Sequence, residues 1–157
     1  MPKKNQTHAL LTPLIIGVFR LNAALITAGD RLVGDLELTS ARWQVLGVVA
    51  NVPVPLSMAS IARTIGLTRQ SVRSVTAELV ASGLVEFQPN PHHRRAQWVV
   101  LTAKGKQVES VARKRQIPWA ADLSKGLDPQ QIELAVALLQ TILGRLDSQA
   151  EAQKEEA

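Results

Sequence analysis

Apolar residues in the first third of the chain recur at intervals of three and four positions, the spacing that places side chains on one face of an α-helix. Thr12-Pro13 offers a capping hydroxyl followed by proline in the first helical turn, and the apolar pattern after it predicts a long amphipathic helix that ends near Gly34. A basic start before an apolar run also resembles a signal peptide. Arg20 and Asn22 interrupt this run below spanning length, which favours the amphipathic helix.

Three shorter helices are predicted over residues 40–50, 58–65 and 69–82, because each segment keeps the helical period between a cap and a stop. The side chains placed to accept hydrogen bonds from the first helical turns are Thr39, Ser57 and Thr68. The residues placed to end these helices are Pro53, Gly66 and Gly83.

The pattern changes to that of extended chain after residue 83. Residues 84–88 and 97–101 are rich in valine and aromatic side chains, and the loop between them, PNPHHRRA, contains two prolines and an asparagine. These segments predict a two-stranded hairpin with a basic tip, which has the form of a wing directly after a helix.

The last third of the chain returns to the helical period. A helix is predicted from Thr102, with a kink or an end at Pro118, and another from Asp128-Pro129, where Gln131 completes a capping-box pattern. Residues 149–157 are polar and acidic and are expected to be frayed or disordered. The predicted fold class is therefore mainly α with a small two-stranded β wing, a winged helix-turn-helix between terminal helices.

Composition agrees with one small globular protein. Of the 157 residues, 46% are hydrophobic and 20% are charged, but only 3% are aromatic, so we expect a core of aliphatic side chains on packed helices. The absence of cysteine excludes disulfides, thiol nucleophiles and cysteine-based zinc sites, and it is compatible with a reducing cytoplasm.

Positive charge is concentrated in the middle of the chain. Residues 57–106 carry seven Lys and Arg against two Glu, an excess equal to the net charge of +5 of the whole protein. A basic segment of this kind favours a polyanionic partner, either nucleic acid or an anionic membrane surface.

One side of the predicted helix 69–82 is suited to DNA. Its apolar side consists of Val72, Val75, Leu79 and Val80. Its polar side consists of Arg69, Gln70, Arg73 and Ser74, with no acid before Glu78. An ordinary solvated face would mix both charges, whereas arginine and glutamine reach base edges and short hydroxyl side chains let a helix approach phosphates. Ala62, Gly66 and Val72 also have the spacing of a helix-turn-helix, whose second helix enters the major groove.

Three segments carry a family resemblance, in the order LTSARWQVLGVVA, MASIARTIGLTRQSVRSVTAELVASGLVE and NPHHRRAQWVVLTAKG. Over nearly the whole chain the sequence resembles the MarR family of bacterial transcriptional regulators. The resemblance implies a homodimer that binds a pseudo-palindromic double-stranded operator. It divides the chain into an N-terminal dimerisation helix (1–38), a winged helix-turn-helix domain (39–101), C-terminal dimerisation helices (102–148) and a polar tail (149–157).

The resemblance also implies roles for single residues. The DNA-reading face would consist of Arg69, Gln70, Arg73 and Ser74. Thr68 and Ser71 would lie near phosphates, and Arg94 and Arg95 would take the wing-tip role in or near the minor groove. A small aromatic or amphipathic acid would bind as effector between the dimerisation helices and the DNA-reading lobe. Trp43 could line that pocket, although packing alone also explains a tryptophan at this position.

The wing departs from the family pattern. It usually reads Asp-Pro-x-Asp-x-Arg, whereas this chain has NPHHRR from Asn90 to Arg95, so two acids that could orient the wing arginine are missing. The tip is more basic as a result. We expect His92 and His93 to lie near phosphate and to make binding more dependent on pH.

Other kinds of site are weaker interpretations. The adjacent His92 and His93 lack the helical spacing of metal ligands and have no neighbouring acid, so neither a metal nor another cofactor is expected. The chain has no nucleophile-elbow or P-loop pattern, which disfavours an enzyme. The run from Arg113 to Arg115 could form a second basic contact, but a solvated face beside Glu109 is favoured.

Together these patterns predict a cytoplasmic, sequence-specific, DNA-binding transcriptional regulator, most simply a homodimeric repressor that an effector releases. The alternative is a winged-helix protein-interaction module whose DNA binding is weak or non-specific. Specific binding that survives competitor DNA would distinguish the first prediction from the second.

Overall fold

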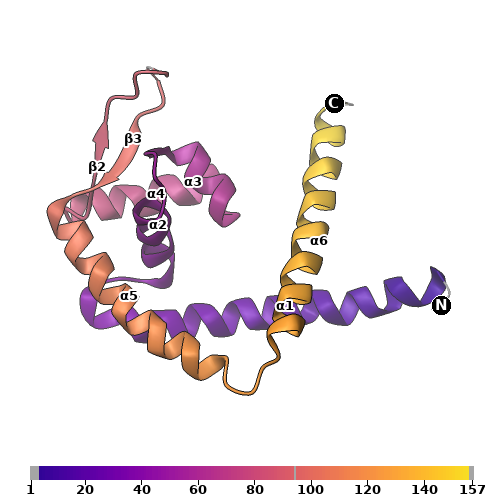
Figure 1. The fold of residues 1–157 in the computed structure, drawn as a ribbon. Coiled ribbons are helices and arrows are strands. Elements are labelled where there is room, and N and C mark those ends of the chain that lie inside the picture. The colour runs from indigo at the N-terminus through magenta and orange to yellow at the C-terminus, as the bar shows by residue number, and fades with distance from the viewer. Residues whose placement is uncertain (1–3, 94, 156–157) are drawn as a thin grey trace. The chain divides into compact units, whose positions relative to one another are not determined.

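The computed structural model describes residues 4–93 and 95–155 (Figure 1). The elements are α1 (Lys4–Val33), the 3₁₀ turn η1 (Gly34–Leu36), α2 (Ser40–Ala50), β1 (Leu56–Ser57), α3 (Met58–Ile65), α4 (Arg69–Ala81), β2 (Val85–Gln88), β3 (Trp98–Leu101), α5 (Ala103–Leu123) and α6 (Pro129–Glu155). The chain divides into two compact units, Met1–Ile117 and Pro118–Ala157, with the boundary inside α5. The predicted class, mainly α with a small β wing, is confirmed.

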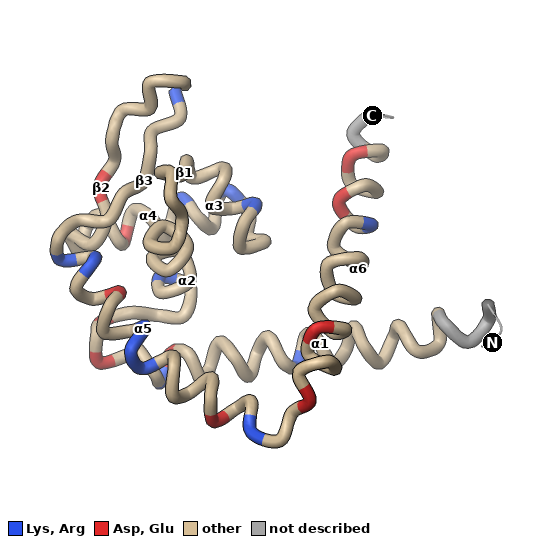
Figure 2. Tube along the Cα trace, in the orientation of Figure 1, with Lys and Arg blue, Asp and Glu red and all other residues tan. Residues whose placement is uncertain are grey.

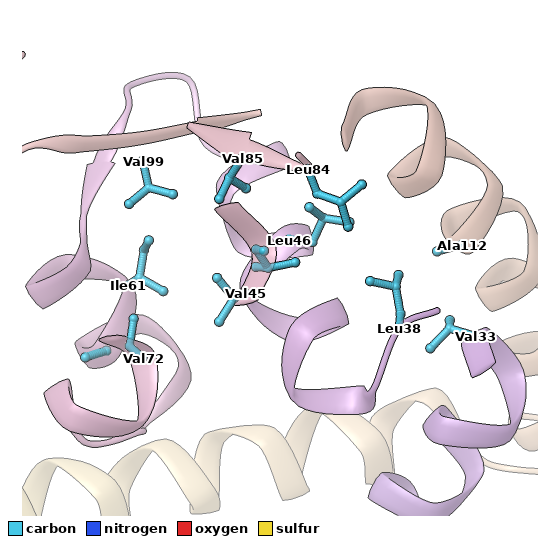
Figure 3. Close-up of a cluster of buried hydrophobic side chains, with 12 residues drawn as sticks. Val33, Leu38, Val45, Leu46, Ile61, Val72, Leu84, Val85, Val99 and Ala112 are labelled. Carbon is cyan, nitrogen blue, oxygen red and sulfur yellow. The ribbon is translucent and has the colours of Figure 1, made fainter. Parts of the chain in front are cut away.

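The core of the first unit lies where α2, α3 and α4 meet the sheet and the end of α1 (Figure 3). Its largest fully buried apolar side chains are Leu46, Ile61, Leu79, Val33, Val45, Val72, Val85 and Val99. Burying a side chain of this kind stabilises a fold by about 1.5–3 kcal/mol relative to leaving it exposed. Since these residues come from several elements, the same burial fixes how α3 and α4 are oriented.

The predicted helices between residues 39 and 82 are confirmed, and their caps form the expected hydrogen bonds. The hydroxyl oxygens of Thr39, Ser57 and Thr68 each accept a hydrogen bond from the backbone N–H three residues ahead, over 3.3, 3.3 and 3.0 Å. Gly66 ends α3 with a φ of 70°, a left-handed conformation that a side chain would disfavour.

The sheet has three antiparallel strands in the described residues, in the order β1-β3-β2, where the sequence predicts two. The predicted hairpin is present, with Phe87 opposite Val99 in the pairing of β2 with β3. The additional strand β1 pairs with the other edge of β3, where Leu56 lies opposite Val99. A strand of two residues is too short to show an alternating pattern, which is why the sequence does not reveal it.

The first helix is longer than its sequence predicts. The prediction that Pro13 starts it is wrong, because α1 already includes residues from Lys4 and passes through the proline. A proline inside a helix removes one hydrogen bond, and here the carbonyl left without a partner belongs to Ala9, an exposed residue that water can reach.

The prediction that Arg20 and Asn22 keep the N-terminal apolar run below spanning length is wrong, because residues 8–36 are long and apolar enough to cross a membrane by length and composition alone. Their mean hydropathy is 1.9, and none of the apolar window is buried within the chain. A helix that packs its apolar face in a soluble assembly has the same properties, and Arg20 lies within this segment. The apolar surface of α1 therefore needs a partner, either a membrane or another protein surface.

The helices of the last third also extend beyond their predicted ends. Pro118 does not end α5, which continues to Leu123. α6 begins as predicted, with the carboxylate of Asp128 accepting the backbone N–H of Gln130 over 3.0 Å. The prediction of a frayed or disordered tail is wrong for residues 149–155, which continue α6 to Glu155. Alanine, glutamine and glutamate dominate these residues, and they favour helix although the segment is polar.

Candidate nucleic-acid interface

α3 and α4 form the predicted helix-turn-helix. Across the turn at Gly66, the backbone N–H of Leu67 donates to the carbonyl of Ala62 over 3.1 Å. Ala62 and Val72 are only 4% and 0% exposed, so they fill the angle between the two helices. This packing presents the opposite side of α4 to solvent.

The exposed side of α4 carries the predicted reading face. Its exposed residues are Arg69, Gln70, Arg73 and Ser74. The buried side consists of Val72, Thr76 and Leu79, with Val75 half-buried. Val80, which the apolar pattern places on the buried side, is instead 37% exposed, because Thr76 occupies the packed stripe between Val72 and Leu79.

The first turn of α4 offers further polar groups. The hydroxyl oxygens of Thr68 and Ser71 lie 2.8 Å apart, and both residues are exposed. The N-terminal end of a helix favours anions, because its first N–H groups lack partners within the helix and the helix dipole is positive there. These groups can therefore receive a phosphate oxygen.

The arginines of this surface are not used within the chain. Arg69, Arg73 and Arg95 form no hydrogen bond or ion pair with any residue that the structure describes. By contrast, Arg115 is held by the carboxylate of Asp35. Guanidinium groups that remain unpaired and exposed are available to an external anion.

The wing tip is a tight turn in which one asparagine replaces a missing acid. The backbone N–H of His93 donates to the carbonyl of Asn90 over 3.2 Å, and the side-chain oxygen of Asn90 accepts the N–H of His92 over 2.9 Å. A carboxylate oxygen would serve the turn in the same way, so this departure from the family pattern keeps the turn contact. His92, His93 and Arg95 are exposed, whereas Arg94 lies outside the described residues.

Charge on this surface is strongly one-sided. Figure 2 shows Lys and Arg positions on α3, α4 and the hairpin with few acids among them. The exposed bases are Arg63, Arg69, Arg73 and Arg95, and the acids of these elements are Glu78 and Glu86. A surface with this imbalance attracts polyanions over distances of about one Debye length, roughly 8–10 Å in physiological salt.

The C-terminal end of α4 is anchored by cations that the sequence analysis missed. Arg42 of α2 donates to the hydroxyl oxygen of Ser82, and the Lys104 ammonium donates to the Ser82 carbonyl over 2.9 Å. The hydroxyl of Thr102 donates to the carbonyl of Gly83 over 2.7 Å. Cations near a helix C-terminus interact favourably with its free carbonyls. This general preference is the only reason the sequence offers to expect a cation at the end of α4.

A hollow of about 360 Å³ lies beside the predicted effector residue Trp43. It is lined by Trp43, Gln44, Gly47, Val48, Asn51, Ile65 and Gln116. The tryptophan is half-buried, so its ring contributes both to the packing and to the wall of this hollow. The lining combines apolar surface with three side-chain amides, a composition suited to a small amphipathic ligand.

The basic run from Arg113 to Arg115 is mostly used for internal contacts. Arg113 pairs with Glu109 over 3.0 Å and also donates to the side-chain oxygen of Asn51. Arg115 forms a two-pronged pair with Asp35, whose second bond measures 2.7 Å. The hydrogen bond from Arg115 lowers the pKa of Asp35, and the same bond raises the pKa of Arg115.

Residues 4–93 and 95–155 contain no group of three or more His, Cys, Asp or Glu side chains that could hold a metal ion.

Comparison with known proteins shows which family this chain resembles. Residues 36–96 match the sequence model of the MarR family. An uncharacterized protein of Mycobacterium tuberculosis is 35% identical over 120 residues, which cover 76% of this chain and 82% of that protein.

Solved structures share the fold over most of their length. The transcriptional regulator BldR from Sulfolobus solfataricus has a TM-score of 0.73 at 23% identity, covering 92% of this chain and 99% of its own. CouR from Rhodococcus jostii RHA1 bound to p-coumaroyl-CoA has a TM-score of 0.72 at 20% identity, covering 80% and 87%. The repressor CouR bound to a 23-mer DNA duplex has a TM-score of 0.68 at 24% identity, covering 81% and 89%. The helix-turn-helix, the wing and these matches together show that the chain belongs to the MarR family of winged-helix, DNA-binding transcription regulators.

Proposed function

We propose that this protein is a sequence-specific transcriptional regulator that binds a pseudo-palindromic operator as a homodimer in the cytoplasm. The observation that carries the proposal is the exposed face of α4, where Arg69, Gln70, Arg73 and Ser74 form no hydrogen bond or ion pair with any side chain that the structure describes and no acid of this helix precedes Glu78. A helix with this face, packed at a fixed angle on α3, is suited to the major groove.

The remaining contacts would position the duplex. Thr68 and Ser71 would hydrogen-bond phosphates at the start of α4. The wing, with Arg94 and Arg95 and the two histidines at 92 and 93, would bind the adjacent backbone and minor groove. Contacts of this kind add affinity for any sequence, whereas the reading face adds the preference for one.

The proposed dimer rests on apolar surface that the chain itself does not cover. On α1, Ile15 and Val18 share one face and are 40% and 37% exposed, and on α6 Leu139 and Leu146 share one face and are 38% and 54% exposed. Exposed apolar stripes of this length mark protein interfaces. A homodimer also matches a palindromic operator, because its two-fold axis repeats the reading helix at two half-sites.

The proposed effector site is the hollow beside Trp43. A ligand there would contact α2, α3 and α5, and so could change the position of the reading helix relative to the dimerisation helices. CouR has been solved both with p-coumaroyl-CoA and with DNA, which supports a ligand-linked regulator of this fold. If such a ligand lowers operator affinity, linkage requires that DNA lowers the affinity for the ligand by the same factor. We propose that the protein is a repressor and that the ligand releases it from the operator in this way.

The test is selection of bound duplexes from a random library, followed by a mobility shift with competitor DNA. We expect a two-fold symmetric sequence to be recovered and its complex to survive excess competitor. Recovery of unrelated sequences, with binding that competitor removes, would contradict the proposal and would support a winged-helix protein-interaction module instead.

A further inference from the structure

A second hollow, of about 260 Å³, separates α4 from the wing. Arg69 and Arg73 line it from the first two turns of α4, and Arg95 lines it from the wing. Its apolar lining consists of the partly exposed side chains Met58, Ala59 and Ala96. The hollow therefore brings three guanidinium groups, two from one helix and one from the hairpin, around a small apolar surface.

No group within the described chain neutralises these three cations. Glu78 and Glu86, the acids of α4 and β2, do not line the hollow. Three guanidinium groups around one small space repel one another. An anion that binds between them attracts all three, and this attraction offsets the repulsion. An arginine with a structural role is paired with an acid of the same chain, as Arg115 is paired with Asp35.

The position and the mixed lining of the hollow indicate what kind of anion it takes. In a duplex, one sugar-phosphate strand separates the major groove from the adjoining minor groove. A winged helix that places α4 in one groove and the hairpin beside the other must therefore have that strand between them. Its phosphates carry the charge, and the deoxyribose carbons next to them are apolar.

We propose that this hollow seats one phosphate of the DNA backbone with its adjoining deoxyribose, clamped jointly by Arg69, Arg73 and Arg95. The inference rests on the proposed function and refines it. The sugar would cover the apolar lining, and the phosphate oxygens would receive charge-assisted hydrogen bonds from the guanidinium groups.

The clamp divides the reading face between two tasks. Arg69 and Arg73 are four residues apart, so they form one stripe along α4, whereas Gln70 and Ser74 form the next stripe round the helix. The first stripe borders the hollow and binds backbone. The second stripe is left to read base edges, so sequence preference depends on Gln70 and Ser74 rather than on the arginines.

The test couples each arginine to individual phosphates of the duplex recovered by selection. Neutral methylphosphonate is placed at one phosphate at a time, and the dissociation constant is measured for full-length wild type and for Arg69→Ala, Arg73→Ala and Arg95→Ala. We expect one position in each half-site where neutralisation weakens wild-type binding by roughly tenfold, the effect of a lost charge-assisted hydrogen bond. In each of the three variants the same neutralisation should cost less than in wild type, because one of the three partners of that phosphate is already gone.

Arg63→Ala is the matched control, since Arg63 is an exposed arginine of α3 that bonds to Ser60 and does not line the hollow. It should remain fully sensitive to that methylphosphonate. Coupling of the three arginines to different phosphates would overturn the clamp. Coupling of Arg73 to a guanine analogue lacking N7, instead of to a phosphate, would overturn it as well.

Two further arms distinguish the clamp from a free-anion site and from binding without sequence preference. If inorganic phosphate displaces the duplex from wild type more than chloride does at equal ionic strength, if Arg73→Ala abolishes this difference, and if no methylphosphonate position couples to the arginines, the hollow takes a free anion and the backbone assignment is wrong. If selection recovers no common sequence and wild type binds all duplexes alike, the proposed function fails first. Specific binding without the shared phosphate would leave the proposed function standing and would refute only the clamp.

Discussion

Asp35 of η1 and Arg115 of α5 join these two elements by a two-pronged ion pair. Because the hydrogen bond from Arg115 lowers the pKa of Asp35 in the folded chain, the ionised carboxylate stabilises the fold above the ordinary aspartate range, near pH 4. This stabilisation is lost as the pH falls through the lowered pKa. We therefore expect Asp35→Asn to lower the melting temperature at neutral pH, by an amount that shrinks below about pH 4.

Thermal unfolding followed by circular dichroism between neutral and acidic pH measures this difference. Asp122→Asn serves as control, because Asp122 of α5 forms a single exposed pair with Lys125 of the turn that follows, a kind of pair that contributes little. A destabilisation by Asp35→Asn that is equally large at every pH would show that the carboxylate charge is not the cause.

Gln70 is one of the two neutral members of the proposed reading face, so its role can be separated from that of the charges. Gln70→Ala should weaken binding to the selected duplex by about 1–3 kcal/mol and relax the preference at one base step, while the salt dependence stays unchanged. Dissociation constants on the selected duplex and on single-base variants, over a range of salt, test this. Gln107→Ala, an exposed position of α5, should change neither quantity. A loss that is uniform across sequences would assign Gln70 to the backbone.

At the level of elements, the start of α5 packs unusually closely against the backbone of Leu84, the residue just before β2. A Cβ added to Gly105 would lie 1.9 Å from the backbone carbonyl oxygen of Leu84, which cannot rotate away. Gly105→Ala should therefore destabilise the protein by at least the roughly 1–3 kcal/mol typical of overpacking. Because Thr102 and Lys104 of the same turn anchor the end of α4, operator binding should weaken too.

Gly47→Ala is the matched control within α2. Nothing lies within 4 Å of the Cβ that it adds, so the usual gain of about 0.5–1 kcal/mol for alanine over glycine in a helix is expected. Denaturant unfolding of both variants gives the comparison. Equal stabilities of Gly105→Ala and wild type would mean that α5 moves freely against β2.

The elements that the sequence predicts well are those with local causes. Thr39, Ser57 and Thr68 cap their helices because a hydroxyl side chain satisfies a nearby N–H, and no distant residue is needed for that. Pro13 and Pro118 mislead for the opposite reason. Whether a proline ends a helix depends on whether water or a neighbour satisfies the freed carbonyl, and this is decided by tertiary surroundings.

In the candidate site, too, the sequence predicts what depends on local spacing and misses what depends on contacts between distant residues. The residues of the reading face follow from helical spacing alone, and the structure leaves all of them exposed. What spacing could not show is that Arg95 of the wing shares a hollow with Arg73, or that Arg42 holds Ser82. These pairs are separated by many residues in sequence, and only the packing of the sheet against α2 and α4 brings them together.

At the scale of the whole molecule, α1 and α6 each carry apolar side chains that their own compact unit leaves exposed. The segment from His8 to Leu36 meets the length and composition of a membrane span, so a bilayer and a second copy of the chain are competing partners for it. Arg20 lies within the span, where a charge is costly in lipid but is readily accommodated at the rim of a protein interface. We therefore expect the full chain to remain in the supernatant after high-speed centrifugation without detergent, and recovery in the membrane pellet would contradict the dimer.

The dimer itself is tested on α6, which has an apolar and a polar side. Leu139 lies on the apolar side and is 38% exposed. Ser148 lies further along α6, on the opposite, polar side of the helix. Leu139→Glu should shift the protein from dimer to monomer in sedimentation velocity, because a carboxylate buried in an apolar interface has no partner. Ser148→Glu adds the same charge to the same helix and should leave the dimer intact.

Operator binding should follow the oligomeric state. A monomer holds only one half-site, so Leu139→Glu should lose most of its affinity for the two-fold symmetric duplex while it keeps its affinity for an isolated half-site. Circular dichroism of the variant must match wild type, which separates lost dimerisation from lost folding. A dimer that survives Leu139→Glu, or a wild type that sediments as a monomer, would remove the symmetric arrangement on which two reading helices depend. The chain would then bind DNA one lobe at a time, and the exposed apolar faces of α1 and α6 would require a different partner.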